Sequence, residues 1–248
     1  MNTFYKYFNG ELTAPVLTIF IGGNHEASNY MQQLPFGGWV APNIFYLGYA
    51  GVVNYRGLRI AGLSGIFNRR HYQLPHFERA PFSPDTLRSV YHIRELDVFR
   101  LGLLRRRASV DVFLSHDWPQ GIALFGDVRG LLRKKKFLRR EICDNTLGSP
   151  PGAFLLHLLR PRYWFSAHMH VKFAAVVRHE SEPACSGTAA FVPASERKHQ
   201  GSKKNEGAVP AESCTRFLAL DKALPGRKFL QFLHITPSER RQTSDALE

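Results

Sequence analysis

The sequence predicts an α/β protein in which mixed sheets are flanked by helices. Three short apolar runs, over 16–21, 110–114 and 163–166, are rich in branched and aromatic residues and are typical of buried strands. Each run ends abruptly in residues that can bind metals or phosphates. Sites in open α/β sheets form beyond the carboxyl ends of such strands. We therefore expect these residues to converge at one edge of a sheet.

The first part of the chain has clear stop and turn signals. Asn9-Gly10 should end a first helix, Arg56-Gly57 should turn a hairpin, and Asp85 should lie in the first turn of a long helix. In chain order we expect a helix over 3–8, a strand over 16–21, a short helix over 24–33, a strand over 44–47, a hairpin over 52–61, a long loop over 66–84 and a helix from 85 to about 106.

The second part repeats this alternation and then changes composition. We expect a strand over 110–114, an extended basic connection, a helix over 151–159, strands over 163–166 and 172–177, and two closing strands over 215–221 and 228–235 that turn at 224–227. The segment 178–213 is rich in Ser, Glu, Lys, Ala, Gly and Pro, so it predicts a disordered insertion. Residues 1–177 and 214–236 would form the core, and 237–248 a flexible tail.

Composition narrows the class of partner. The chain of 248 residues carries 33 Lys and Arg against 20 Asp and Glu, a net charge of +13, which favours a polyanion such as nucleic acid. A basic tail or a solvated helix face is the alternative. No apolar stretch approaches the ~20 residues that cross a bilayer, so we expect no membrane partner. The 3 cysteines are scattered, which indicates a reducing compartment and structural roles.

The residues after the three apolar runs form a candidate metal site. Imidazole nitrogens bind transition metals such as Zn, Fe or Mn, which makes His116, His168 and His170 candidate ligands. His168 and His170 are two residues apart and could serve different ions of a pair. Asn24 offers a neutral amide oxygen, which suits a site that an anionic phosphate must also enter. His25 is better placed to donate a proton to a leaving oxygen. Each histidine taken alone is more often structural.

Longer strings resemble known enzymes. Gly22-Gly23-Asn24-His25-Glu26, Ser115-His116-Asp117 and Ala167-His168-Met169-His170 resemble motifs of the calcineurin-like metallophosphoesterases. The strings at 19–29, 37–44, 91–94, 115–119 and 217–222 resemble the RNA lariat debranching enzyme family more narrowly, and the resemblance covers nearly all of the chain outside 178–213.

The resemblance implies a fold, a reaction and a set of roles. It implies a metallophosphoesterase-type sandwich, a nuclear location, and hydrolysis of the 2′–5′ phosphodiester at the branch point of excised introns. It implies that the metal ligands are Asn24, His116, His168 and His170, that His25 is the catalytic histidine, and that the loop at about 66–90 recognises branched RNA. The complete family site holds two divalent ions, Fe, Zn or Mn.

The loop composition agrees with a role in RNA binding. Cations and aromatic rings alternate there, and cations neutralise phosphates while rings stack on splayed bases. The alternative is an ordinary basic loop. The runs 105–107 and 133–140 add cations that suit a solvated face, a nuclear-import signal or RNA contact equally well. The candidate RNA-binding residues are Asn68, Arg69, Arg70, His71, Tyr72, Tyr91 and Arg94.

The chain departs from the family pattern at its amino terminus. It lacks the family's Cys-x-His on a first strand and Gly-Asp after a second, so we expect an incomplete fold in which strand 16–21 has an open edge. The remaining ligands are all neutral, so we expect fewer ions, poor metal binding and little or no activity. Neither Asp117 nor Glu26 is expected to substitute. The alternatives are a catalytically dead branched-RNA-binding module, or a metallophosphoesterase for DNA ends or nucleotides.

Overall fold

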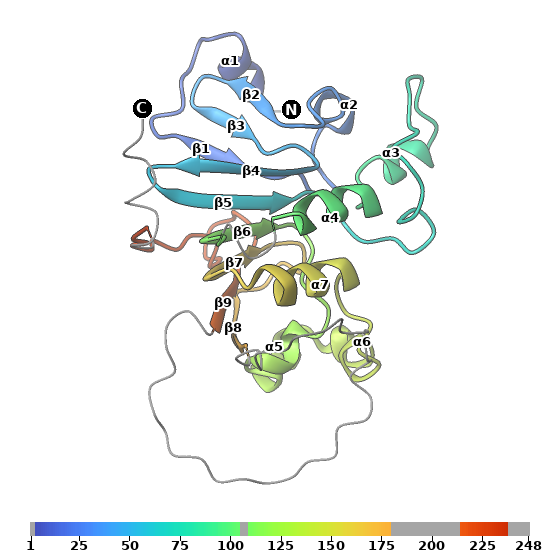
Figure 1. The fold of residues 1–248 in the computed structure, drawn as a ribbon, viewed down its shortest axis with the longest axis vertical. Helices are drawn as coiled ribbons and strands as arrows, with labels where there is room; N and C mark the ends of the chain where they lie inside the picture. Colours follow the sequence, from blue (N-terminus) through green and yellow to red (C-terminus); the bar gives the residue numbers. More distant parts are fainter. Residues whose placement is uncertain (1–2, 105–108, 180–213, 238–248) are drawn as a thin grey trace, which may run out of the picture.

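The computed structural model describes residues 3–104, 109–179 and 214–237, and these form a mixed α/β fold with two sheets (Figure 1). This confirms the predicted fold class. Residues 180–213 of the expected insertion, 238–248 of the expected tail and 105–108, which include the basic run 105–107, lie outside the described residues.

The smaller sheet has the order β1-β3-β2. Strand β1 runs parallel to β3, and β2 pairs with β3 antiparallel, with a register shift between Trp39 and Ala41. The strands are β1 (Thr18–Phe20), β2 (Gly38–Ala41) and β3 (Ile44–Tyr46). As expected, β1 is an edge strand, because β3 is its one strand partner within the described chain.

The larger sheet has the order β4-β5-β6-β7-β9-β8. Its four middle strands are parallel, and an antiparallel strand closes each side. The predicted hairpin joins β4 to β5, with Arg56 and Gly57 at φ of 51° and 77° in its turn. The strands are β4 (Ala50–Tyr55), β5 (Leu58–Leu63), β6 (Val112–Ser115), β7 (Tyr163–Ser166), β8 (Phe173–Arg178) and β9 (Cys214–Ala219).

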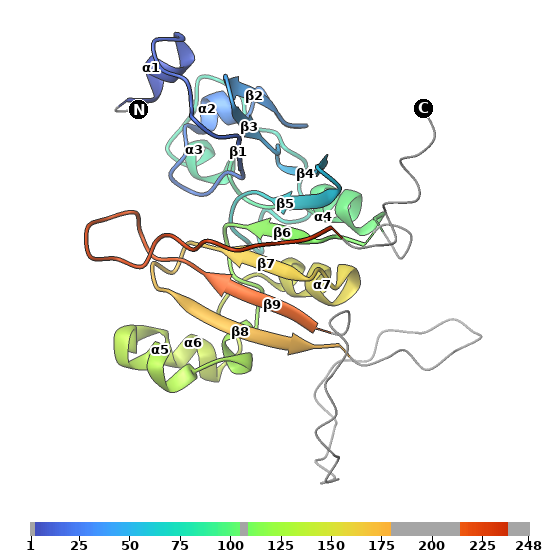
Figure 2. The ribbon, with the colours of Figure 1, turned by 90° about the vertical axis from the view of Figure 1, so that its left-hand side faces the viewer.

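Helices flank these sheets (Figures 1 and 2). Helix α7 begins with Ser149, whose side-chain oxygen accepts a hydrogen bond from the Gly152 N–H, and with prolines in its first turn. The helical segments are α1 (Phe4–Phe8), α2 (Ser28–Met31), α3 (Thr86–Ser89), α4 (Glu95–Gly102), η1 (Ile122–Phe125), α5 (Val128–Lys134), η2 (Lys136–Leu138), α6 (Arg139–Cys143) and α7 (Pro150–Leu159). None of the helices in the described chain is long and apolar enough to cross a membrane.

Aromatic packing fixes the strands that carry the candidate site. Phe113 of β6 stacks on Trp164 of β7 with ring centroids 4.0 Å apart, and both side chains are fully buried. Trp118, just after β6, stacks on Phe173 of β8 at 5.1 Å. Burying each of these large rings contributes on the order of 2–3 kcal/mol. The carboxyl ends of β6 and β7 are therefore held rigidly side by side.

Three predicted elements differ from the structure. The expected helix 85–106 is two helices, because the residues between α3 and α4 turn inward and Ile66 forms a bridge with His92. The basic connection after β6 is helical rather than extended: Asp127 caps α5 by accepting from the Gly130 N–H, and Leu131 is buried. The expected strand 228–235 is absent, because these residues lie exposed outside both sheets.

Candidate active site

Three of the predicted ligands converge. Asn24 follows β1, His116 follows β6 directly, and His168 lies two residues after β7. His116 Nε2 is 2.9 Å from Asn24 Oδ1 and 3.1 Å from His168 Nδ1. His116 Nε2 therefore lies within hydrogen-bond distance of one amide oxygen and one further ring nitrogen, although Asn24 and His116 are 92 residues apart in the sequence.

The backbone is shaped for this approach. A Cβ on Gly23 would lie 2.4 Å from His116 Nδ1, so only glycine lets the turn after β1 lie against the imidazole. His168 and His170 adopt left-handed φ of 56° and 49°, which turns the chain sharply after β7. The Ala167 N–H donates to the His116 carbonyl at 3.1 Å, and the Trp118 indole donates to the Ala167 carbonyl at 2.9 Å.

The imidazoles of this site are held neutral. Burial, followed by the charges of His168, His25 and His170, lowers the pKa of His116 to about 4. Burial, followed by the charge of His25, also lowers the pKa of His168. A neutral imidazole has a free lone pair, which is the form that binds a metal.

His25 and His170 flank the three converging residues. His25 is exposed on the turn after β1, and its charge contributes to the lowered pKa of His116, His168 and His170. For His170 that shift comes first from burial and then from Lys222 and Lys135. The histidines thus face one region, yet the described chain contains no group of three or more His, Cys, Asp or Glu side chains that could hold a metal.

The nearby carboxylates are engaged elsewhere. Asp117 accepts from the Phe67 N–H at 3.2 Å and from the Trp118 N–H at 2.9 Å, and burial raises its pKa to about 6 despite these bonds. Glu26 accepts from the Gly23 N–H in its own turn. Asn24, His116 and His168 therefore fit a single transition-metal ion with neutral donors, and among the described residues no acidic ligand joins them.

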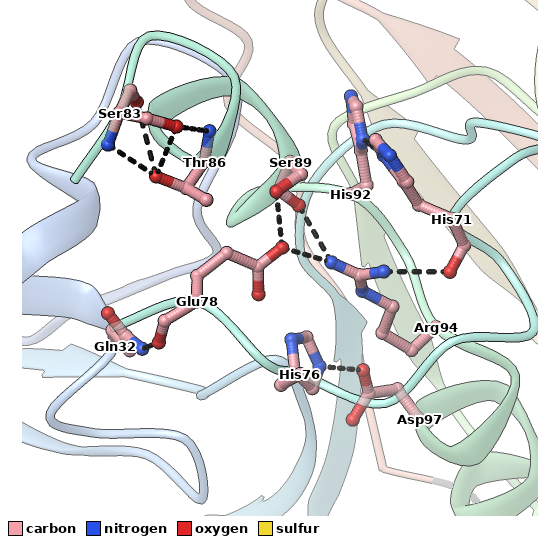
Figure 3. A network of polar contacts seen from close by, with 10 residues as sticks. All are labelled: Gln32, His71, His76, Glu78, Ser83, Thr86, Ser89, His92, Arg94 and Asp97. Carbon is pink, nitrogen blue, oxygen red and sulfur yellow. Dashed lines mark hydrogen bonds and ion pairs between the residues drawn. The ribbon is translucent and has the colours of Figure 1, made fainter. Parts of the chain in front are cut away.

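A buried ion pair holds the loop beyond β5 (Figure 3). The Arg94 guanidinium is fully buried and contacts the Glu78 carboxylate, which also accepts from the Ser89 hydroxyl. Arg94 further donates to the carbonyls of His71 at 2.8 Å and Ser89 at 3.0 Å. The prediction that Arg94 contacts RNA is therefore wrong, because its side chain is buried inside the loop and holds the loop together by an ion pair and hydrogen bonds.

The other candidate RNA-binding residues divide by exposure. Arg69 and Arg70 are exposed, and Tyr91 is half-buried at a pocket that Gly22 and Gly23 also line. Asn68 Oδ1 accepts from the Arg70 N–H at 3.0 Å, His71 pairs with His92, and Tyr72 packs against the core. The loop therefore presents Arg69 and Arg70 on its surface, and Tyr91 lies at the pocket beside the Gly22-Gly23 turn.

Sequence reasoning missed the residues that hold this loop. Glu78 is 16 positions from Arg94 in a segment without periodicity, so no spacing rule could have paired the two. His76 is likewise joined to Asp97 by a 2.7 Å contact and stacks on Tyr49 with centroids 4.0 Å apart. Only the excess of polar residues in a predicted loop hinted at an internal network.

His92 should make the free energy of unfolding depend on pH. It is buried, and its Nδ1 lies 2.7 Å from His71 Nδ1; burial, followed by the charges of His71 and Arg94, lowers the pKa of His92 to about 4. The unfolded chain binds the proton near pH 6.5, so this contribution is present above pH 6.5 and is lost as pH falls toward 4, by up to about 3 kcal/mol. Urea unfolding at pH 7.5 and 4.5 should show a smaller acid loss for His92→Gln than for the wild type. Equal losses would contradict this assignment.

Comparison with known proteins places these features in context. A family model described as the C-terminal domain of the lariat debranching enzyme matches residues 212–248. A lariat debranching enzyme of Danio rerio is 53% identical over 248 residues, which is 100% of this chain and 39% of the relative. Lariat debranching enzymes of Homo sapiens and Arabidopsis thaliana are each 51% identical over 235 residues, 95% of this chain and 38% and 49% of those relatives. The chain thus spans less than half the length of these relatives.

Proposed function

Because the chain is homologous to lariat debranching enzymes along its whole length, we propose that it hydrolyses the 2′–5′ phosphodiester of branched RNA in a metal-dependent reaction. The proposal includes a nuclear location, since introns are excised there. The observation that supports it most is the convergence of Asn24, His116 and His168 at the ends of three strands.

Each converging residue has a role in this proposal. Asn24, His116 and His168 would hold one divalent Fe, Zn or Mn ion, and His170 would be a ligand of the second ion in a complete two-ion site. An ion held by these residues would polarise the phosphate and lower the pKa of an attacking water. Because the donors found here are neutral, we expect weak metal affinity and low turnover for residues 1–248.

His25 supplies the proton in this reaction. Its exposed imidazole on the Gly23-Asn24-His25 turn faces the same region as His116, where a ring nitrogen can donate to the departing 2′ oxygen. The Asn24 side chain keeps its oxygen on the His116 side of the turn. The exposed Arg69 and Arg70 would neutralise phosphates of the strand next to the branch.

An assay of the purified chain tests the proposal. Residues 1–248 are incubated with Mn²⁺ at rising concentrations and with a synthetic RNA that carries one 2′–5′ branch. We expect cleavage at the 2′–5′ bond alone, increasing with metal and stopped by a chelator. Cleavage of 3′–5′ bonds at the same rate would favour a different metallophosphoesterase, one that acts on DNA ends or nucleotides.

His25→Ala should separate proton donation from metal binding. We expect turnover of branched RNA to fall by about 10²- to 10⁴-fold while the metal content of the protein is unchanged, because the residue acts on the leaving group. Metal content is measured by mass spectrometry of the dialysed protein, and turnover under saturating Mn²⁺. A parallel loss of metal would make His25 a ligand and overturn its assigned role.

A second function is favoured by the neutral donor set. The carboxylates of Asp117 and Glu26 are engaged by backbone N–H groups, so neither of these two side chains offsets the charge of an ion at Asn24. The chain would then be a branched-RNA-binding module without turnover. Salt-sensitive binding of branched RNA, with no cleavage at any metal concentration, would support this module over the enzyme.

A further inference from the structure

A basic face lies on the helical connection between β6 and α7. We define the basic face as the exposed side chains of Arg133, Lys134, Lys136, Phe137 and Arg139. These side chains extend from α5, η2 and α6. Buried Leu131, Leu138 and Ile142 fix the opposite side of the same segment against the core. The cations are therefore presented on a firm surface.

The charge of this face is not neutralised internally. Within residues 3–104, 109–179 and 214–237, no carboxylate forms an ion pair with Arg133, Lys134, Lys136 or Arg139. The next cation, Arg140, pairs with Asp144 at 3.5 Å and is left out of the face. Four unpaired cations within seven consecutive positions suit a ligand with regularly spaced negative charges.

The face and the candidate active site lie toward the same ends of the strands (Figure 2). Its segment is docked on the sheet by a bridge between Gly126 and Ala175 of β8. In Figure 2, α5 and α6 lie toward the same side as the arrowheads of β7 and β9, which is the side where the candidate site lies. The charge of Lys135, in the middle of this segment, also reaches His170.

Phe137 adds an exposed aromatic ring to the basic face. Its ring is 72% exposed, and the Lys135 ammonium lies 5.9 Å from the ring centroid. Exposing an aromatic ring to water is unfavourable in the protein alone. In complexes with single-stranded nucleic acid, such a ring stacks on unpaired bases, and the neighbouring cations contact phosphates. A duplex buries its bases, so this combination favours a single strand.

We propose that the basic face binds one single-stranded arm of a branched RNA as that arm leaves the branch point. This inference rests on the proposed function, because it places the branch at Asn24, His116 and His168. The loop at about 66–90, with Arg69 and Arg70, would hold the RNA on the side of the site away from the basic face. A branched RNA has three arms, so two separate surfaces beside one site match its shape.

The test compares arm lengths. Two branched RNAs, and a linear RNA of the same length as the short one, are titrated against residues 1–248 in the presence of a chelator. The short branched RNA has single-nucleotide arms, and the long one has one arm extended by about eight nucleotides. The basic-face variant carries Arg133→Gln, Lys134→Gln, Lys136→Gln and Arg139→Gln. The matched control removes four exposed cations elsewhere, by Arg56→Gln, Arg178→Gln, Arg216→Gln and Lys228→Gln. Phe137→Ala is measured separately.

We expect the wild type to bind the long RNA more tightly than the short one, and the basic-face variant to lose that gain while keeping its affinity for the short RNA. The salt slope for the long RNA should fall by up to about 3, since each contact with a single strand accounts for about 0.7. Phe137→Ala should weaken binding of the long RNA about tenfold.

Three outcomes overturn the inference. The wild type gains nothing from a longer arm, or the basic-face variant keeps the gain, or the control variant loses as much of it. In each case tight binding of the short branched RNA would leave the proposed function intact. If the wild type does not prefer short branched RNA to linear RNA, the proposed function fails as well. If the basic-face variant keeps all of its RNA affinity but no longer enters the nucleus, the run 133–140 is a nuclear-import signal.

Discussion

Gly23→Ala should weaken metal binding further, although glycine carries no ligand. The added Cβ would lie 2.4 Å from His116 Nδ1 and 2.5 Å from its Cε1, too close for any real contact. Either the imidazole or the turn after β1 must move, and both carry donors of the candidate site. We expect a loss of roughly 10- to 100-fold in metal affinity, measured by titration with Mn²⁺ or Co²⁺, and a parallel loss of turnover.

The neighbouring glycine provides the matched control. A Cβ on Gly22 would meet the Tyr46 hydroxyl at 3.5 Å, which is ordinary van der Waals contact. Gly22→Ala should therefore bind metal as the wild type does. If Gly23→Ala also binds normally, His116 is not positioned by this turn and the site described here is wrong.

Arg94→Met should be the most destabilising single change in the loop. It leaves the Glu78 carboxylate buried without its cation, and removal of one partner from a buried pair typically costs about 3–5 kcal/mol. The change also removes the bonds that join His71 and Ser89. Thermal unfolding should show a Tm lowered by at least about 6 °C.

An exposed ion pair provides the matched control for the stability effect of Arg94→Met. Arg140 and Asp144 form an i,i+4 pair on the surface of α6, and such pairs contribute about 0.5 kcal/mol or less. Arg140→Met should therefore leave Tm nearly unchanged. Equal effects of the two substitutions would show that Arg94 and Glu78 do not hold the loop. An additional effect of Arg94→Met on RNA affinity is expected to be indirect, since the side chain is fully buried.

The sequence predicted the strands better than the connections. The runs that became β6 and β7 are short, apolar and bounded by polar residues, so local pattern determined them. Strand β2 was missed because Gly38-Trp39-Val40-Ala41 carries a glycine and pairs across a register shift. The break between α3 and α4 was also missed, because burial of His92 and Arg94 overrides a helical pattern.

The candidate site was predictable as a set of residues and not as a geometry. Asn24, His116 and His168 are predicted ligands because each follows an apolar run, and in the structure His116 Nε2 lies 2.9 Å from Asn24 Oδ1 and 3.1 Å from His168 Nδ1. The sequence could not show that Gly23 makes room for His116, or that Asp117 is used by two backbone N–H groups. Those facts depend on contacts between segments distant in sequence.

Cobalt(II) titration followed by visible absorption shows whether Asn24, His116 and His168 bind a metal ion together, because the absorption bands of the ion report nitrogen and oxygen ligands. We expect bands that saturate near one ion per chain, are absent in His116→Ala and are retained in His92→Gln. Bands of equal strength in His116→Ala, or none in the wild type at millimolar cobalt, would contradict a metal site built on Asn24, His116 and His168.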